Sequence, residues 1–443
     1  MSSPVPRTIS SYLARRAVGS PWRMEPPPER GFTGAVVIPA RAESANLPHT
    51  LASLAANPRD LLDRFMVIVV VNNRADADPA EKDDNRKVLE LLSLWHGEYG
   101  PALCMVDAAS PGRELPPGEG VGLARRIGMD LALNCLDHGA GDPLLVCLDA
   151  DTLVRPDYLA AIVRHFSASP AGAASLPFRH QPAADQAGQA AIDRYELFLR
   201  GYVLGLRLAG SPYAFHTVGS AMACRASAYA AAGGMNRRLA GEDFYFLQQM
   251  HKVAGVGTLH GTTVYPSPRS SHRVPFGTGR SVGDMLRDGE QRVMFYKPQL
   301  FEILEQWLAC VAESPDAGGD GLLRKAGGIY SLLREFLEEA GFAGARDTML
   351  RQCRDQARLA AAFHGWFDAF RTMRLIHHLT DRCFGRVGPE QALPPLLERA
   401  GYEGPETVTD MLVWLQIHDG AVMNGGQGET DLRNRNAGKI KLV

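Results

Sequence analysis

Four short, wholly apolar runs separated by helix-like stretches constrain the fold of this chain more than any other feature. The apolar runs cover residues 35–38, 66–71, 102–106 and 144–148. Because they show no polar–apolar alternation, they are typical of strands that are buried on both faces. Helix-like stretches lie between them, at residues 47–56, 84–94 and 121–136. This alternation predicts an α/β fold with a mostly parallel sheet, helices on its faces and right-handed crossovers.

The chain is too long for that sheet alone, since 443 residues allow two or three domains of roughly 100–200 residues each. Amphipathic stretches without strand candidates follow at residues 300–311, 327–340, 346–379 and 407–417. We therefore expect four parts: an N-terminal arm (1–33), an α/β domain (34–298), an all-helical extension (299–420) and a polar tail (421–443). We expect the extension to cap the ligand site of the α/β domain, on the side where a second substrate, the acceptor, would bind. The alternative is that it forms a homodimer surface.

Composition excludes several classes of protein. Forty-seven basic and forty-nine acidic residues give a net charge of −2, so binding of nucleic acid as the main function is not expected. The longest strongly apolar run, residues 65–71, is far shorter than the ~20 residues of a transmembrane helix. No secretory signal is visible, so none is expected, and seven widely spaced cysteines without a C-x-x-C pair indicate reduced thiols. These features predict a cytoplasmic protein.

Two carboxylates, Asp149 and Asp151, follow the fourth apolar run directly. Ligands of parallel sheets bind at the carboxyl ends of the strands, and two carboxylates there can share one hard divalent cation. The same tripeptide recurs as Asp76-Ala77-Asp78 in a polar loop, where a solvated turn is the better interpretation. The strand that precedes Asp149 therefore distinguishes the two copies.

A second acidic pair, Glu242 and Asp243, opens an apparent helix after Gly241. Acidic residues in a first turn stabilise a helix by ~0.3–1 kcal/mol without any catalytic role. A carboxylate near a metal site is also what a reaction that needs a general base would use. Both interpretations stay open at this point.

Polar groups also follow the first two strands. Pro39, Ala40 and Glu43 come after the first apolar run, and Asn72 and Asn73 come after the second. At the strand ends they are placed to hold a base and a ribose, or they form ordinary turns.

A glycine-rich segment, residues 118–126, contains Arg125 and resembles a loose dinucleotide fingerprint. That interpretation is rejected because no strand runs directly into the segment, which follows the third strand and not the first. We expect its glycines and Arg125 to approach a phosphate-bearing ligand.

Taken together and in this order, the motifs resemble those of the family 2 glycosyltransferases, which have the GT-A fold. The resemblance covers about residues 34–300, roughly two-thirds of the chain, and is specific to fold and donor class. It implies a nucleotide-sugar donor across the strand ends, and a Mn²⁺ or Mg²⁺ ion bound by Asp151. It further implies that Asp149 contacts ribose or the metal and that Asp243 is the general base. One departure is Ala-Arg-Ala before Glu43, in place of an aromatic-Asn pair, which leaves the base-binding details open.

Similar enzymes often take a third metal ligand from a loop after the base-bearing helix, and His272 is the candidate here. Neutral imidazole can ligate manganese, and arginines such as Arg273 can neutralise a diphosphate. A structural histidine is the alternative. The Gly-Thr-Gly stretch at 277–279 indicates a loop that orders over the bound donor.

The expected reaction is a single displacement with inversion, in which Asp243 accepts the proton of the acceptor hydroxyl and Glu242 orients Asp243 or contacts the acceptor. Basic residues are frequent between 237 and 297, which indicates either a solvated face or recognition of an anionic small-molecule acceptor. Without a transmembrane segment, transfer of one sugar to a soluble or peripheral acceptor is favoured over polymer synthesis.

Two other functions compete with this one. A sugar nucleotidyltransferase would need a glycine-rich loop directly after the first strand, where this chain has no glycine between Pro39 and Glu43. A non-catalytic scaffold that binds a nucleotide-sugar is the other alternative, and the presence of all four acidic residues in the two pairs argues against it.

Overall fold

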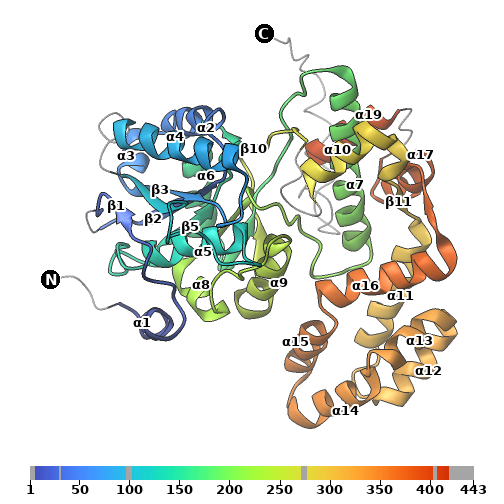
Figure 1. Cartoon of the computed structure of the whole chain (residues 1–443). Coiled ribbons are helices and arrows are strands. Elements are labelled where there is room, and N and C mark those ends of the chain that lie inside the picture. The colour runs from blue at the N-terminus through green and yellow to red at the C-terminus, as the bar shows by residue number, and fades with distance from the viewer. Residues whose placement is uncertain (1–4, 29–30, 96–101, 271–276, 403–406, 419–443) are drawn as a thin grey trace, which may run out of the picture.

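A computed structural model describes residues 5–28, 31–95, 102–270, 277–402 and 407–418. Its centre is an eight-stranded sheet with strand order β1-β4-β3-β2-β5-β8-β7-β9 (Figure 1). The strands are β1 (Met24–Glu25), β2 (Gly34–Ala40), β3 (Phe65–Asn72), β4 (Leu103–Ala108), β5 (Leu144–Cys147), β7 (Ala173–Ser175), β8 (Met222–Arg225) and β9 (Val256–Thr258). The α/β class with a mostly parallel sheet is confirmed.

The four predicted strands form the parallel centre of the sheet. In their register Ala35 lies beside Met66 on β3 and beside Leu145 on β5, so β2 is the middle strand. Since β2, β3 and β5 run in the same direction, their carboxyl ends meet at one edge. Three of the expected polar segments therefore converge on that edge.

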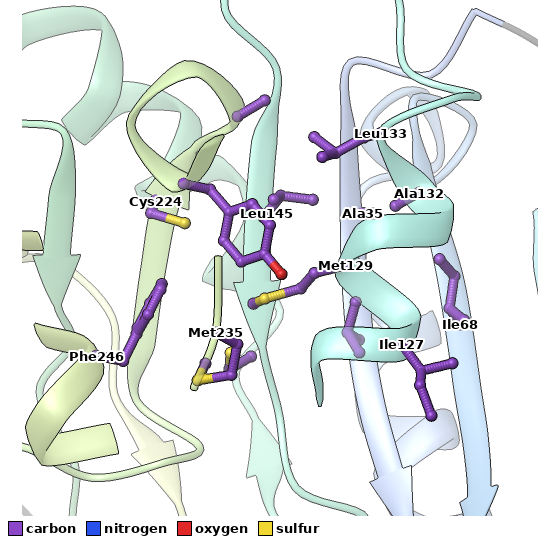
Figure 2. Packing of buried hydrophobic residues seen from close by; sticks show 14 of the residues in the cluster. Ala35, Ile68, Ile127, Met129, Ala132, Leu133, Leu145, Cys224, Met235 and Phe246 are labelled. Atoms are coloured by element: carbon purple, nitrogen blue, oxygen red, sulfur yellow. The ribbon is translucent and has the colours of Figure 1, made fainter. Parts of the chain in front are cut away.

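Helices cover both faces of the sheet, since alternate residues of a strand point to opposite sides. Figure 2 shows Ile127 and Met129 of α5 packed toward the strand residues Ile68 and Leu145, on the face that α9 also covers. The helices of this body are α1 (Arg7–Arg15), α2 (Leu47–Ala55), α3 (Arg59–Leu62), α4 (Pro79–Trp95), α5 (Val121–Ala132), α6 (Tyr158–Ala168), α8 (Ala226–Ala232) and α9 (Glu242–Ala254). Helices α2, α3, α4 and α6 pack on the opposite face.

The N-terminal arm is attached to the sheet body through one buried carboxylate. Asp130 on α5 accepts hydrogen bonds from the Tyr12 and Tyr229 hydroxyls, each at 2.7 Å. It also accepts one from the Val18 amide at 2.8 Å. Strand β1 then pairs with β4, so the arm contributes to the sheet.

The helical extension is present and forms a second core around the buried Trp307. Its elements are α11 (Pro298–Ala312), α12 (Gly319–Ile329), α13 (Ser331–Glu339), α14 (Phe342–Gln352), α15 (Gln356–Trp366), α16 (Ala369–Leu379), the π-helix η2 (Thr380–Phe384), α17 (Pro389–Ala392), α18 (Pro394–Arg399) and α19 (Val408–His418). In the described residues of the extension, the one strand is β12 (Arg386–Val387), which pairs with β11 (Phe295–Tyr296). The polar tail, 421–443, lies outside the described residues.

The hydrophobic core of the extension also includes residues that precede position 298. Helix α7 (Gln186–Leu208) lies between β7 and β8 in the sequence, yet its Leu197 and Leu204 belong to the core of the extension. Figure 1 shows α7 beside α10 (Thr278–Asp288) and α19, away from the sheet. Within the part of the chain that the structure describes, no helix is both long and apolar enough to cross a bilayer.

Candidate functional site

The site lies at the carboxyl edge of the sheet and is organised around Arg125. This arginine of α5 is 2% exposed, and its guanidinium contacts two carboxylates that are far apart in sequence. Nη2 donates to Oδ1 of Asp149 at 2.5 Å, and Nη1 donates to Oε1 of Glu242. Burial alone would lower the pKa of Arg125, but Asp149 and Glu242 raise it above its usual value. Arg125 therefore links the end of β5 to the first turn of α9.

Gly122, which precedes Arg125 in α5, allows a close contact between α5 and the segment before α9. A Cβ on Gly122 would lie 2.6 Å from the Asn236 carbonyl oxygen, and the Gly122 amide donates to the Arg238 carbonyl at 3.3 Å. The start of α5 thus rests on the segment that leads into α9. In this structure the Gly122 amide and both Nη atoms of Arg125 contact protein groups. The expected approach of this segment to a phosphate-bearing ligand stays a prediction.

Glu242 and Asp243 form the first turn of α9, directly after Gly241 with its left-handed φ of +68°. Burial, the neighbouring charge of Glu242 and the charge of Asp149 together raise the pKa of Asp243 to about 7, although Arg125 opposes this. Burial also raises the pKa of Glu242, against the opposing effect of Arg125. An aspartate whose pKa is near neutrality can both accept and release a proton at physiological pH.

A second arginine holds the other acidic pair. Nη2 of Arg269 contacts both Oε1 of Glu43 and Oδ2 of Asp151, the latter at 2.9 Å. Burial raises the pKa of Asp151 to about 6; Glu43 and Asp149 add to this, and Arg269 opposes it. Glu43 is oriented from its own side by Asn46, whose Nδ2 donates to Oε2 at 2.8 Å.

A divalent cation fits the chemistry of this edge. The oxygens of Glu43 and Asp151 converge on one guanidinium nitrogen, and carboxylate oxygens are the ligands that Mn²⁺ and Mg²⁺ prefer. Two arginines face five carboxylates, which leaves an excess of negative charge when all are ionised. The carboxylates are Glu43, Asp149, Asp151, Glu242 and Asp243. Among the described residues, however, no group of three or more His, Cys, Asp or Glu side chains is arranged as a metal site.

The remaining donor-side candidates have backbone partners. Asn72 donates through Nδ2 to the Ala40 carbonyl at 3.1 Å, and Asn73 donates through Nδ2 to the Ala109 carbonyl at 3.3 Å. Both side chains are buried, with 4% and 1% of their surface exposed. Pro39 and Ala40 are buried within β2. These four residues are thus part of the packing at the strand ends, and their contact with a donor stays a prediction.

Two predicted site residues, His272 and Arg273, lie outside the described residues. The Gly-Thr-Gly stretch differs from its expected loop, because Thr278 and Gly279 form the first turn of α10. The second acidic tripeptide is a turn as expected, with Asp76 72% exposed and paired with Arg74.

The described basic residues between 237 and 297 lie in different environments. On and after α10, Arg280, Arg287 and Arg292 pair with the aspartates 284 and 288 of the same region, which supports a solvated face. Arg269, in contrast, joins the acidic site described above.

Sequence reasoning missed the roles of Arg269, Gln181 and Asn85. Gln181 donates through Nε2 to the backbone carbonyl of Asp151 at 2.9 Å, and Asn85 donates to the Asn73 side chain at 2.8 Å. Asn85 also accepts from the Ala42 amide, at a residue with a left-handed φ of +53°. Of the three, the sequence could have indicated only Arg269, because it is a basic residue in the segment whose arginines were expected to neutralise the diphosphate.

No protein-family model matches the chain, and no curated protein sequence matches it. Among solved structures it is similar to residues 1–349 of TarS from S. aureus in complex with UDP-GlcNAc. The identity is 12%, the match covers 87% of this chain and 91% of that one, and the TM-score is 0.39. It is also similar to the mannosyltransferase PcManGT from Pyrobaculum calidifontis in complex with GDP-Man and Mn²⁺. There the identity is 18%, the coverage 82% and 93%, and the TM-score 0.36. At these TM-scores, function has to be inferred from the side chains of the site.

Proposed function

We propose that this chain is an inverting, metal-dependent glycosyltransferase. It moves one sugar from a nucleoside-diphosphate sugar to a hydroxyl of a soluble or peripheral acceptor in the cytoplasm. The observation that carries the proposal is the ion-pair chain Glu242–Arg125–Asp149 around the buried Arg125, which joins the helix of the proposed base to the end of β5. It sets an aspartate with a pKa of about 7 beside the strand edge where parallel sheets bind ligands.

Asp243 is the general base of the proposed reaction. As the acceptor oxygen attacks the anomeric carbon, its proton passes to the Asp243 carboxylate. The bond between the anomeric carbon and the diphosphate oxygen breaks at the same time, and its electron pair leaves with the nucleoside diphosphate. Attack opposite to the leaving group inverts the anomeric centre. A base is most effective when its pKa is close to the working pH, and desolvation of Asp243 together with the charge of Glu242 brings its pKa there.

The donor side is formed by Glu43, Asp149 and Asp151, with His272 and Arg273 as further candidates from the sequence. A bound Mn²⁺ or Mg²⁺ would offset the charge that develops on the leaving diphosphate. Glu43 and Asp151 would hold the ion, and Asp149, whose side chain is 34% exposed, would contact the ion or the ribose. Glu242, held by Arg125, orients the first turn of α9 and hence Asp243.

The pairing of the α10 arginines with local aspartates removes the main argument for an anionic acceptor, so the proposal does not include one. A nucleotidyltransferase is not favoured either. The bend after β2 contains Ala42 in a left-handed conformation and no glycine that would open a triphosphate cradle.

The donor is identified first, by a thermal-shift screen of nucleoside diphosphates and nucleotide-sugars with Mn²⁺, since a bound ligand raises the melting temperature. Release of nucleoside diphosphate from the best donor, with water as the acceptor, is then measured. We expect Mn²⁺-dependent release that is lost in Asp151→Ala and falls at least a hundredfold in Asp243→Asn. Asp76→Ala, in the exposed copy of the tripeptide, is the matched control. An Asp243→Asn enzyme that is active without metal would refute the mechanism.

A further inference from the structure

Arg269 lies between two carboxylates of the site, where the proposed divalent metal ion would bind. It follows β10 (Val264–Tyr265) and reaches Glu43, 226 residues away, and Asp151, 118 residues away. Its Nε and Nη2 atoms both lie close to Oδ2 of Asp151, at 3.0 and 2.9 Å, and Nη2 also contacts Glu43. One guanidinium thus joins the residues that follow β2 and β5.

The backbone around this contact is fixed, while the arginine side chain is not enclosed. Gln181 donates through Nε2 to the Tyr265 carbonyl at 2.7 Å and to the Asp151 carbonyl at 2.9 Å. Strand β10 pairs with β6 (Leu153–Val154), which begins two residues after Asp151. The Arg269 side chain, in contrast, is 32% exposed, against 6% for Glu43 and 21% for Asp151. Gln181 thus holds the backbone of Asp151, and Asn46 holds the Glu43 carboxylate, by contacts that do not involve the arginine.

Arg269 would compete with a divalent ion for the same oxygens, Oε1 of Glu43 and Oδ2 of Asp151. A divalent ion such as Mg²⁺ needs carboxylate oxygens at roughly 2.0–2.1 Å, and the lone pairs that face Arg269 are those that would face the ion. Without a cation, however, Glu43 and Asp151 would repel each other in a partly buried site. The guanidinium therefore relieves this repulsion while it blocks the ion.

We infer that Arg269 is an internal counter-ion that competes with the divalent metal at Glu43 and Asp151. The inference rests on the proposed function. When the donor enters with the metal, the guanidinium leaves the carboxylates and transfers its hydrogen bonds to the diphosphate, the natural partner for a bidentate arginine. The metal alone then binds weakly, and metal with nucleotide binds tightly.

The test measures Mn²⁺ binding directly, by electron paramagnetic resonance of the free ion, in the whole protein with and without the nucleoside diphosphate found in the screen. Arg269→Met removes the charge and keeps the length of the side chain. We expect it to bind Mn²⁺ without nucleotide at least tenfold more tightly than the wild type. Nucleotide should then increase its Mn²⁺ affinity less than it increases that of the wild type. Arg269→Lys keeps one positive charge without the bidentate geometry and should lie between the two.

Arg334→Met is the control, because Arg334 forms an exposed ion pair with Glu338 on α13 in the extension. It should bind Mn²⁺ as the wild type does. If Arg269→Met fails to fold, as judged by circular dichroism, Arg269→Lys still has to show the increase. If the wild type binds Mn²⁺ with nucleotide but neither Arg269 variant binds the ion more tightly without it, the inference is overturned and the proposed function stands. If no form binds Mn²⁺ even with nucleotide, the metal-dependent function and the inference both fall.

Discussion

Asp243 is the residue whose ionisation should control the rate. Because burial and the charge of Glu242 raise its pKa to about 7, a large fraction of Asp243 is protonated below neutrality. A protonated aspartate cannot accept a proton, so kcat/KM should rise tenfold per pH unit below about 7 and level off above it. The measurement is donor hydrolysis between pH 5.5 and 8.5. A profile that is flat over this range would show that another group is the base.

The same pKa has a consequence for stability. The folded state binds the Asp243 proton more tightly than the unfolded chain, whose value is near 3.8, so the free energy of unfolding should fall as pH rises from about 4 to 7. Asp243→Asn removes the ionised group. It should stabilise the protein at pH 8 by up to about 4 kcal/mol, since one pKa unit corresponds to about 1.4 kcal/mol, and change little at pH 4. Urea unfolding of both proteins at the two pH values measures this difference, and equal effects at both would contradict it.

Gly219 determines whether Arg125 can hold its two carboxylates. A Cβ at Gly219 would lie 2.4 Å from Nη2 of Arg125. An arginine end can normally move aside, but this one is fully buried and bonded to Glu242 and Asp149. We expect Gly219→Ala to cost about 1–3 kcal/mol of stability and to reduce activity at least tenfold.

A glycine in open space is the control for Gly219. Gly328 lies in α12 with no heavy atom within 4 Å of an added Cβ, so Gly328→Ala should be neutral or stabilise by up to about 1 kcal/mol. Chemical denaturation and donor hydrolysis of the two variants are compared. Similar effects of both substitutions would show that the contact with Arg125 is not the cause.

At the scale of elements, α16 of the extension braces α9, the helix that carries Asp243. Lys252 of α9 pairs with Asp368 at 2.5 Å, and the Phe370 amide donates to Oε1 of Gln248 at 2.8 Å. The Tyr245 and Phe370 rings also lie 5.9 Å apart. Helix α9, which carries the proposed base, is therefore held on one side by Arg125 and on the other by the extension.

Asp368→Asn tests this brace. Asp368 also caps α16 by accepting from the Arg371 amide, a role that asparagine can retain, so the substitution removes mainly the charge that faces Lys252. We expect a loss of about 1–2 kcal/mol in stability and a lower kcat with an unchanged melting shift by the donor. Asp355→Asn, in the equivalent exposed cap of α15, should stay within about 0.5 kcal/mol of the wild type. Equal effects would contradict the brace.

Local patterns predicted the strands that lie in uniformly apolar runs, and missed three short strands that include Ser175, Arg225 or Thr258. The four apolar runs became β2, β3, β4 and β5, because strands buried on both faces leave an unbroken apolar signal. The strands β7, β8 and β9 have only three or four residues, too few to show a period. The site residues were likewise predicted only where a local pattern marks them. Acidic residues at strand ends could be placed from sequence, whereas the arginines that hold them form contacts over 24 to 226 residues, which no local pattern encodes.

At the scale of the whole molecule, sequence order and packing disagree about where the extension begins. Periodicity placed a boundary near 298, because strand candidates end there. The core of the extension nevertheless includes Leu197, Leu204 and Leu206 of α7, a helix inserted between two strands of the sheet. A Cβ on Gly205 would lie 2.5 Å from the Phe301 ring of α11, so these two helices are in close contact. The extension is completed by a segment of the α/β part.

A chain that ends at residue 298 should therefore not fold as an independent catalytic domain. It would expose the apolar face of α7 that α11 and α18 cover in the full chain. We expect residues 1–298 to aggregate or to bind an apolar fluorescent dye, and to melt without the cooperative transition of the full protein. In the full chain, Gly205→Val should cost at least about 2 kcal/mol by forcing α7 from Phe301. Gly344→Val, where an added Cβ meets open space, should not. A monomeric 1–298 fragment that melts cooperatively and hydrolyses the donor would show that α7 does not depend on the extension.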